Sequence, residues 1–373
     1  MRPLPRLLAL AALFAVAAGA PAAPVPPADP APSFVSIPGG IVDPGNKVVY
    51  VTGESGNIEA LNLEDGKLLW DSKDATKPLA VAGKKLIAQA PEKGKANAVR
   101  VVVLDGAEKG KKVLESDAVT FPDWVATGLA HGRSFASSAV LERNDLLLKW
   151  DARAWYAGGA RPTPEIEKAA RKEAHGVARV NLESGKVEML ADDKLPAEAT
   201  KLPKALENEK SRQYWTGSDW KTTPIATGGG FAALVQEDKG GPLSLKRWDA
   251  AGKPLETVEL MKGKELWPMV SADGRHLLVH QALVKEQLPE GDYAWWVFSL
   301  ETGKQVAKLP YEGNNGMAVV GDRAFMVVAG QRKGPPRPGM WEQPRTLKVF
   351  DIKSGKLAWE HAAEPHKMLP PLP

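Results

Sequence analysis

Histidine is the first residue type to consider, because imidazole nitrogens bind metal ions and exchange protons near neutral pH. The chain has six histidines, and His276 and His280 lie four residues apart in a segment that resembles a β-strand. Side chains an even number of residues apart lie on one face of a strand, so both imidazoles point the same way. Four residues of strand span about 13 Å, which is too far for two ligands of one ion. We therefore interpret both as packed or exposed strand histidines, with a metal site as the weaker alternative.

The sequence contains none of the short motifs that mark common catalytic centres. The metalloprotease motif HExxH, the Walker A loop, the G-x-S-x-G elbow and the Asp-rich calcium loop are all absent. There are no cysteines, which excludes disulfides, thiolate metal ligands and the acylated N-terminal Cys of a lipoprotein. We therefore predict no cofactor, no metal site and no catalytic activity.

Tryptophan is the second residue type that stands out, with 12 in the chain. Trp70 and Trp359 close two similar segments, and we expect them to pack between neighbouring sheets. Five others lie in or beside predicted loops and insertions, namely Trp215, Trp220, Trp295, Trp296 and Trp341. Loop aromatics on one rim of a protein can form a surface for a partner or a glycan. Buried anchoring of the insertions is the alternative, and both interpretations stay open.

A repeated hairpin pattern must position these residues. ALNLEDGKLLW (60–70) and VFDIKSGKLAW (349–359) share a Gly-Lys pair and a closing Trp. The frame recurs without the Trp at 179–189 and 297–307, and in looser form at 103–114 and 247–256. Each copy predicts a strand, a polar reversal whose glycine adopts positive φ, and a second strand. The predicted turn residues are Gly66, Gly110, Gly185, Gly252, Gly303 and Gly355.

Each reversal is preceded by a glycine-containing bend that leads into a hydrophobic strand. GNKVVYVTG (45–53), HGRSFASSAV (131–140) and DGRHLLVHQ (273–281) are three of the six examples. Units of this kind give small antiparallel sheets that cannot bury both faces alone, and stacking them in a ring supplies the missing burial. We therefore predict an all-β fold, a β-propeller of six to eight four-stranded antiparallel blades.

Two stretches interrupt the repeat with a helix-forming composition. Residues 162–175 carry acidic residues early and basic residues late, and 202–214 are similar. We predict both as short helical insertions between strands. A Pro/Gly-rich loop, 331–344, interrupts the last unit.

The frame A-L-D/N-x-x-x-G-K-x-x-W in the first and last units resembles the PQQ-like, quinoprotein-type β-propeller repeat. VSADGRHLLVHQ (270–281) is more similar to a WD40-type or TolB-type blade. The resemblance covers 33–363 and implies a ring closed by pairing of the N- and C-terminal strands, with 33–37 as the closing strand. Quinoprotein dehydrogenases of this family bind pyrroloquinoline quinone and calcium, but they are much longer and often carry a vicinal disulfide. The chain looks closer to the non-enzymatic periplasmic scaffolds of the family.

The N-terminus resembles a signal peptide. Arg2 and Arg6 precede an apolar run, 7–18, that is too short to cross a membrane. We expect cleavage near Ala20 or Ala22, which gives four segments: signal peptide 1–22, Ala/Pro-rich linker 23–32, propeller 33–363 and Pro-rich tail 364–373. The mature protein is then exported, periplasmic or secreted, and has no transmembrane anchor.

Charge and composition narrow the class of partner. Loss of Arg2 and Arg6 lowers the formal net charge from +4 to +2, and the basic residues are interspersed with acidic ones. This pattern lacks the basic stripe that nucleic-acid binding requires. We predict a monomeric binding or scaffolding module for a protein or envelope partner. A quinone-dependent dehydrogenase and a glycan- or small-ligand-binding propeller are the open alternatives.

Overall fold

The structure is a computed structural model of the full chain. It describes residues 34–125, 131–156, 163–190, 202–206, 211–215, 218–222, 224–227, 229–238, 241–263, 266–271, 274–281, 294–311, 317–329 and 345–363. All of these belong to one compact unit, Ala31–Pro373. The predicted signal peptide, linker and C-terminal tail, the loop 331–344 and Trp341 lie outside the described residues.

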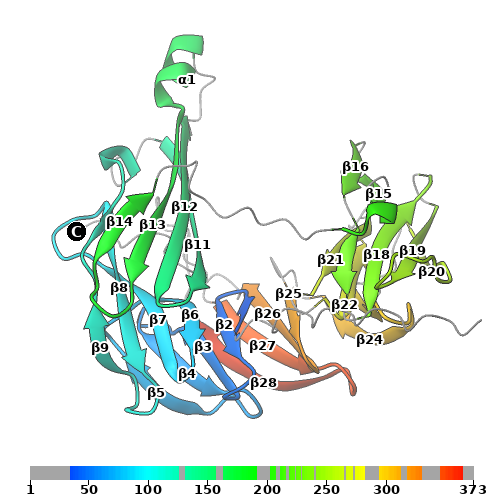
Figure 1. The fold of residues 1–373 in the computed structure, drawn as a ribbon, viewed down its shortest axis with the longest axis horizontal. Helices are drawn as coiled ribbons and strands as arrows, with labels where there is room; N and C mark the ends of the chain where they lie inside the picture. The colour runs from blue at the N-terminus through cyan, green and yellow to red at the C-terminus, as the bar shows by residue number, and fades with distance from the viewer. Residues whose placement is uncertain are drawn as a thin grey trace, which may run out of the picture. The chain divides into compact units, whose positions relative to one another are not determined.

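The described residues form six sheets, here called blades 1 to 6 in chain order (Figure 1). Blade 1 contains β1 (Val35–Ile37), β2 (Gly40–Asp43), β3 (Val48–Thr52), β4 (Ile58–Asn62) and β5 (Leu68–Ser72). Blade 2 contains β6 (Lys77–Ala82), β7 (Lys85–Pro91), β8 (Ala98–Asp105), β9 (Lys111–Glu115) and β10 (Val119–Thr120). Blade 3 contains β11 (His131–Glu142), β12 (Asp145–Tyr156), β13 (Lys172–Asn181) and β14 (Val187–Leu190).

The second half of the chain repeats this plan. Blade 4 contains β15 (Ser211–Trp215), β16 (Ser218–Thr222), β17 (Ile225–Thr227), β18 (Gly230–Gln236), β19 (Pro242–Asp249) and β20 (Val258–Lys262). Blade 5 contains β21 (Leu266–Val270), β22 (His276–Gln281), β23 (Ala294–Ser299) and β24 (Gln305–Pro310). Blade 6 contains β25 (Met317–Val320), β26 (Arg323–Ala329), β27 (Arg345–Asp351) and β28 (Lys356–Ala363). Strand pairing is antiparallel, apart from one parallel contact between β15 and β18.

The predicted helical insertions are much shorter than their composition indicates. In the first, α1 spans only Pro164–Ala170, with Thr163 as N-cap, and β13 begins at Lys172. In the second, a 3-10 turn, η3 (Lys204–Leu206), is followed by β15. A third short turn, η1 (Asp123–Val125), lies between blades 2 and 3. β13 pairs with β12, and β15 pairs with β16, so the backbone N–H and C=O groups of these residues are hydrogen-bonded in a sheet. Tertiary pairing therefore overrides their helix propensity.

Each blade contains a set of four consecutive antiparallel strands, numbered here without the additional strands β1, β10, β15 and β16, and the Gly-Lys reversals join the third and fourth strands of these sets. All six predicted glycines have positive φ: Gly66 (69°), Gly110 (78°), Gly185 (74°), Gly252 (81°), Gly303 (70°) and Gly355 (67°). In blade 1 the amide of Gly66 donates to the carbonyl of Asn62 at 2.9 Å, and the Asn62 side chain accepts the amide of Glu64 at 2.8 Å. The polar residue that ends the third strand therefore caps the turn, and the glycine reverses the chain.

One predicted strand occupies a different place in its blade. In five units the bend-and-strand segment forms the second strand, as β3 and β22 do. In blade 3 the predicted segment, 131–140, lies in the first strand, β11, and β12 is the second. The bend pattern detects a hairpin strand but does not distinguish its two arms.

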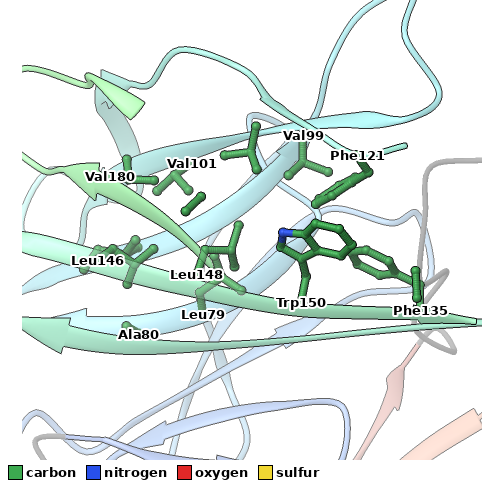
Figure 2. Packing of buried hydrophobic residues seen from close by; sticks show 14 of the residues in the cluster. Leu79, Ala80, Val99, Val101, Phe121, Phe135, Leu146, Leu148, Trp150 and Val180 are labelled. Carbon is green, nitrogen blue, oxygen red and sulfur yellow. The ribbon is translucent and has the colours of Figure 1, made fainter. Parts of the chain in front are cut away.

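Apolar side chains pack five pairs of neighbouring blades together. Figure 2 shows the junction of blades 2 and 3, where Val99 and Val101 of β8 face Leu146 and Leu148 of β12. Similar clusters join blades 1 and 2, blades 4 and 5, and blades 5 and 6. A further cluster joins blade 6 to blade 1, so the last sheet packs on the first. The protein therefore has an all-β, propeller-type fold.

Closure between blades 6 and 1 differs from the strand exchange that the family resemblance implies. β1 does not pair with blade 6; it pairs with β2, with Val35 opposite Val42. Its side chains lie against β25 of blade 6. Side-chain packing, and not a shared sheet, therefore holds the first and last blades together.

The two frame tryptophans reach from one blade to the turn of the next. Trp359 of β28 lies over Gly66, where a Cβ would be 2.7 Å from its Cδ2 atom. The Trp359 Nε1 donates to the carbonyl of Leu63 at 3.0 Å, across the closure. Trp70 of β5 lies over Gly110 in the same way, and a Cβ there would overlap its ring. The glycines are thus required twice, for positive φ and for the space that the indole occupies.

We expect Gly110→Ala to destabilise the protein by about 2–4 kcal/mol, because left-handed backbone strain adds to the overlap with Trp70. Gly83→Ala is the matched control, since Gly83 has φ of 62° and nothing within 4 Å of its Cβ position. That variant should lose only about 1 kcal/mol. Urea unfolding measures both. In a Trp70→Ala background, the cost of Gly110→Ala should fall to that of the control; an unchanged cost would refute the packing argument.

Candidate binding site

An aromatic cluster lies at one end of blade 5, here called the blade 5 platform: Trp267, His280, Trp295 and Tyr311. Strand register builds it, because Trp267 of β21 is opposite His280 of β22, which is opposite Trp295 of β23. Paired residues of adjacent strands share one face of a sheet. Tyr311 follows β24 and completes the group.

The rings of the platform contact one another in defined geometries. Trp267 stacks on His280 with centroids 5.5 Å apart and planes 17° apart. His280 meets Trp295 edge to face at 4.6 Å, and Tyr311 lies 5.2 Å from His280. Such contacts stabilise ring pairs by about 0.5–1.5 kcal/mol beyond burial. The imidazole is therefore held from three sides, and it supports the indole of Trp267.

Exposure distinguishes the members of the platform. Trp267 is 40% exposed, whereas Trp295 is 5% exposed and packs with Leu309 and Met317 between blades 5 and 6. Trp295 is thus the buried base of the platform, and Trp267 is its accessible surface.

The five tryptophans considered from sequence have separate positions. Trp295 is buried, as described. Trp296, its neighbour, points to the opposite face and packs, half-buried, against the apolar cluster of blades 4 and 5. The Lys308 Nζ lies 5.6 Å from the centre of its ring. Trp215 is the last residue of β15, and Trp220 lies in β16, both in blade 4; their side chains are outside the described part of the structure. Trp341 lies outside the described residues altogether. Of the five, only Trp295 and Trp296 have described side chains, and these two lie on opposite faces of blade 5.

Two exposed tryptophans were missed by sequence reasoning: Trp267 and Trp155, which is 46% exposed on β12. Neither lies in a predicted insertion or in the repeat frame. Alternation along the strand could have indicated their faces only once the strand limits were known. For Trp267, the signal is its pairing with His280, which requires the β21–β22 register.

The two strand histidines lie near opposite ends of β22. His280 belongs to the platform, and His276 lines a polar pocket of about 540 Å³ formed by turns of blades 4, 5 and 6. The pocket is lined by Gly229, Gly274, Arg275, His276, Ser299, Glu301, Gly321 and Asp322. Among the described residues, no group of three or more His, Cys, Asp or Glu side chains is placed to hold a metal ion.

A half-buried amine lies at the junction of blades 2 and 3. The Lys77 Nζ of β6 donates to the carbonyl of Ser137 at 3.0 Å and to its Oγ at 2.7 Å. Burial lowers the pKa of Lys77, and no Asp or Glu pairs with it among the described residues. Removing an ammonium from water without a counter-charge favours the neutral amine.

Comparisons with known proteins give only distant likenesses. No protein-family model and no curated protein matches the sequence. Among solved structures, BamB from Moraxella catarrhalis is 16% identical, with a TM-score of 0.25 over 88% of this chain and 78% of that one. A eukaryotic initiation factor is 10% identical, with a TM-score of 0.34 over 89% and 90%. The β-propeller domain of Myceliophteria_thermophila Cps50 (Swd1) is 13% identical, with a TM-score of 0.28 over 88% and 85%. Likenesses this weak say nothing about a ligand. None of the described helices is long and apolar enough to cross a membrane.

We expect Trp295→Ala to cost about 3–5 kcal/mol of stability, because it empties a buried indole site. Trp267→Ala should cost less than about 1 kcal/mol, since 40% of this residue is exposed to solvent. Urea unfolding of the two variants measures the difference. Equal costs would show that Trp267 is a core residue and would remove the platform as a surface.

Lys77 predicts a stability that increases at alkaline pH. Its pKa is lower in the folded state than the ordinary 10.5, so the unfolded chain binds more protons between the two values. The free energy of unfolding therefore gains a contribution that grows as pH rises through that window. Urea unfolding at a series of pH values should show this gain in the natural protein and lose it in Lys77→Met. The same pH dependence in both proteins would contradict the assignment.

Proposed function

We propose that the protein is an exported β-propeller that acts as a binding module, and that the blade 5 platform contacts a protein partner of the cell envelope. Arg2, Arg6 and the apolar run 7–18 resemble a signal peptide and support export. The platform offers contact area and no nucleophile–base pair, so its role is recognition and not turnover.

The exposed Trp267 ring carries this proposal. Indole rings are enriched at the few interface positions that supply most of the binding free energy. The ring is stacked on His280, which in turn contacts Trp295 and Tyr311. A partner therefore meets a side chain that is already ordered, and binding loses little conformational entropy.

The outer strands supply a second reason to favour a protein partner. The fourth strand of most blades exposes an apolar side chain at or near the same offset from the turn glycine. These are Leu68 and Leu69 in blade 1, Val113 in blade 2, Met189 in blade 3, Val306 in blade 5 and Leu357 in blade 6. A protein partner can contact apolar side chains of this kind, whereas a sugar chain gains most from flat aromatic rings.

Photo-crosslinking tests the proposal. A photoreactive phenylalanine analogue replaces Trp267 in the full chain, expressed in its host, and the same analogue replaces Trp155 in the control. Both positions are similarly exposed, at 40% and 46%. We expect a discrete protein adduct from position 267 and none of that mass from position 155. No adduct at position 267, or the same adducts at both, would overturn the proposal.

A direct affinity measurement completes the test. The partner identified by mass spectrometry should bind Trp267→Ala at least about 30-fold more weakly than the natural protein, as expected of a hot-spot residue. Binding to Trp155→Ala should be unchanged.

A glycan is the second candidate, because Trp267 is 40% exposed and sugar rings stack on exposed aromatic rings. Binding on a glycan array that is lost in Trp267→Ala, without a protein adduct at position 267, would select this alternative.

A further inference from the structure

A serine and a lysine lie side by side where blades 2 and 3 meet, away from the blade 5 platform. Lys77 belongs to β6 and Ser137 to β11, the first strands of their blades, and these two strands are in contact. The 2.7 Å separation of Lys77 Nζ and Ser137 Oγ is within the range required between a nucleophile and its base. Both residues are half-buried, so the pair is partly shielded from solvent and partly accessible.

The surroundings of Lys77 favour a basic amine over a fixed cation. An ammonium that serves only to join two sheets would be stabilised by a carboxylate, and none pairs with Lys77 among the described residues. Burial accounts for the lowered pKa of Lys77, and no charged group among the described residues contributes to the shift. A neutral lysine amine accepts a proton from a hydroxyl, as in serine–lysine hydrolytic centres.

The environment of Ser137 provides an orienting group and a donor. The Oε1 atom of Gln89, a buried side chain of β7, lies 3.5 Å from Ser137 Oγ. β11 is an edge strand, paired only with β12, so alternate residues direct both N–H and C=O away from the sheet. Ser137 is one of these residues, because its carbonyl accepts Lys77. Its own N–H therefore points to the same open edge, where it can donate to the oxyanion that forms on the substrate carbonyl oxygen when Ser137 Oγ attacks.

We propose that Ser137 and Lys77 form a nucleophile–base pair that transfers and hydrolyses acyl groups of carboxylic esters. Ser137 Oγ attacks the ester carbonyl carbon as its proton moves to Lys77 Nζ. The carbon–oxygen bond to the leaving alcohol breaks, and Lys77 returns the proton to that alcohol. Water then attacks the acyl-serine, Lys77 accepts the water proton and passes it to Oγ, and the carboxylic acid leaves. No oxidant or metal is consumed.

The simplest alternative is that the pair only ties blade 2 to blade 3. The hydrogen bonds of Lys77 would then support packing, and Ser137 would react no faster than an ordinary serine. Ser138 provides the internal comparison: it is the next residue on the same strand and is exposed on the opposite face.

A fluorophosphonate probe distinguishes the two. Its P–F bond breaks when a serine oxygen attacks phosphorus, with loss of fluoride, so it labels only activated serines. We expect peptide mass spectrometry of the full chain to place one adduct on Ser137 and none on Ser138. The labelling rate should rise with pH as Lys77 loses its proton. Ser137→Ala should abolish labelling, whereas Ser138→Ala should retain it.

Two lysine variants separate basicity from packing. Lys77→Met should lower the labelling rate at least about 100-fold, the usual contribution of a general base. Lys77→Arg keeps a hydrogen-bonding cation but cannot act as a base, and it should lose labelling to the same extent while remaining folded by circular dichroism. Retention of labelling in Lys77→Arg, equal labelling of Ser137 and Ser138, or none at all in the folded natural protein would each overturn the proposal.

Discussion

The contact between a turn glycine and the outer strand of the preceding blade is the constraint on which much of the fold depends. A Cβ at Gly66 would meet Trp359 of blade 6, and one at Gly185 would lie 2.9 Å from the Glu115 carbonyl of blade 2. Gly303 faces Val258 of blade 4 at 2.9 Å. Each glycine lets its blade approach the previous one closely enough for their apolar faces to exclude water. The glycine of the repeat frame is thus required by a contact between neighbouring blades.

This constraint explains why the blade 5 platform lies at strand ends and why the proposed serine–lysine pair lies at a blade junction. Apolar packing between blades holds the strands in one register, and that register alone brings Trp267, His280 and Trp295 into a row. The same packing of blades 2 and 3 brings Lys77 to Ser137, sixty residues further along the chain. Side chains positioned by sheets are held more firmly than those on loops, which reduces the entropy lost on binding.

The lysine of the Gly-Lys pair has a role on the outer edge. Fourth strands present unpaired backbone groups and apolar side chains such as Leu68 and Leu357 to solvent. Strand edges of this kind invite pairing with other chains, and a lysine at the start of the strand opposes it. Lys67 and Lys356 lie beside those leucines, so the frame encodes both the turn and a protected edge.

The sequence by itself determined the all-β class, the number of hairpin units and the positive-φ glycines, because these follow from local turn chemistry and alternation. It did not determine the lengths of the insertions: residues from Lys172 onward have helix-forming composition, yet pairing with β12 makes them a strand. Nor could it reveal that Trp295 is buried while Trp267 is exposed, or that Lys77 meets Ser137. Those facts depend on which faces of distant strands meet, and only the packing of one blade on the next decides that.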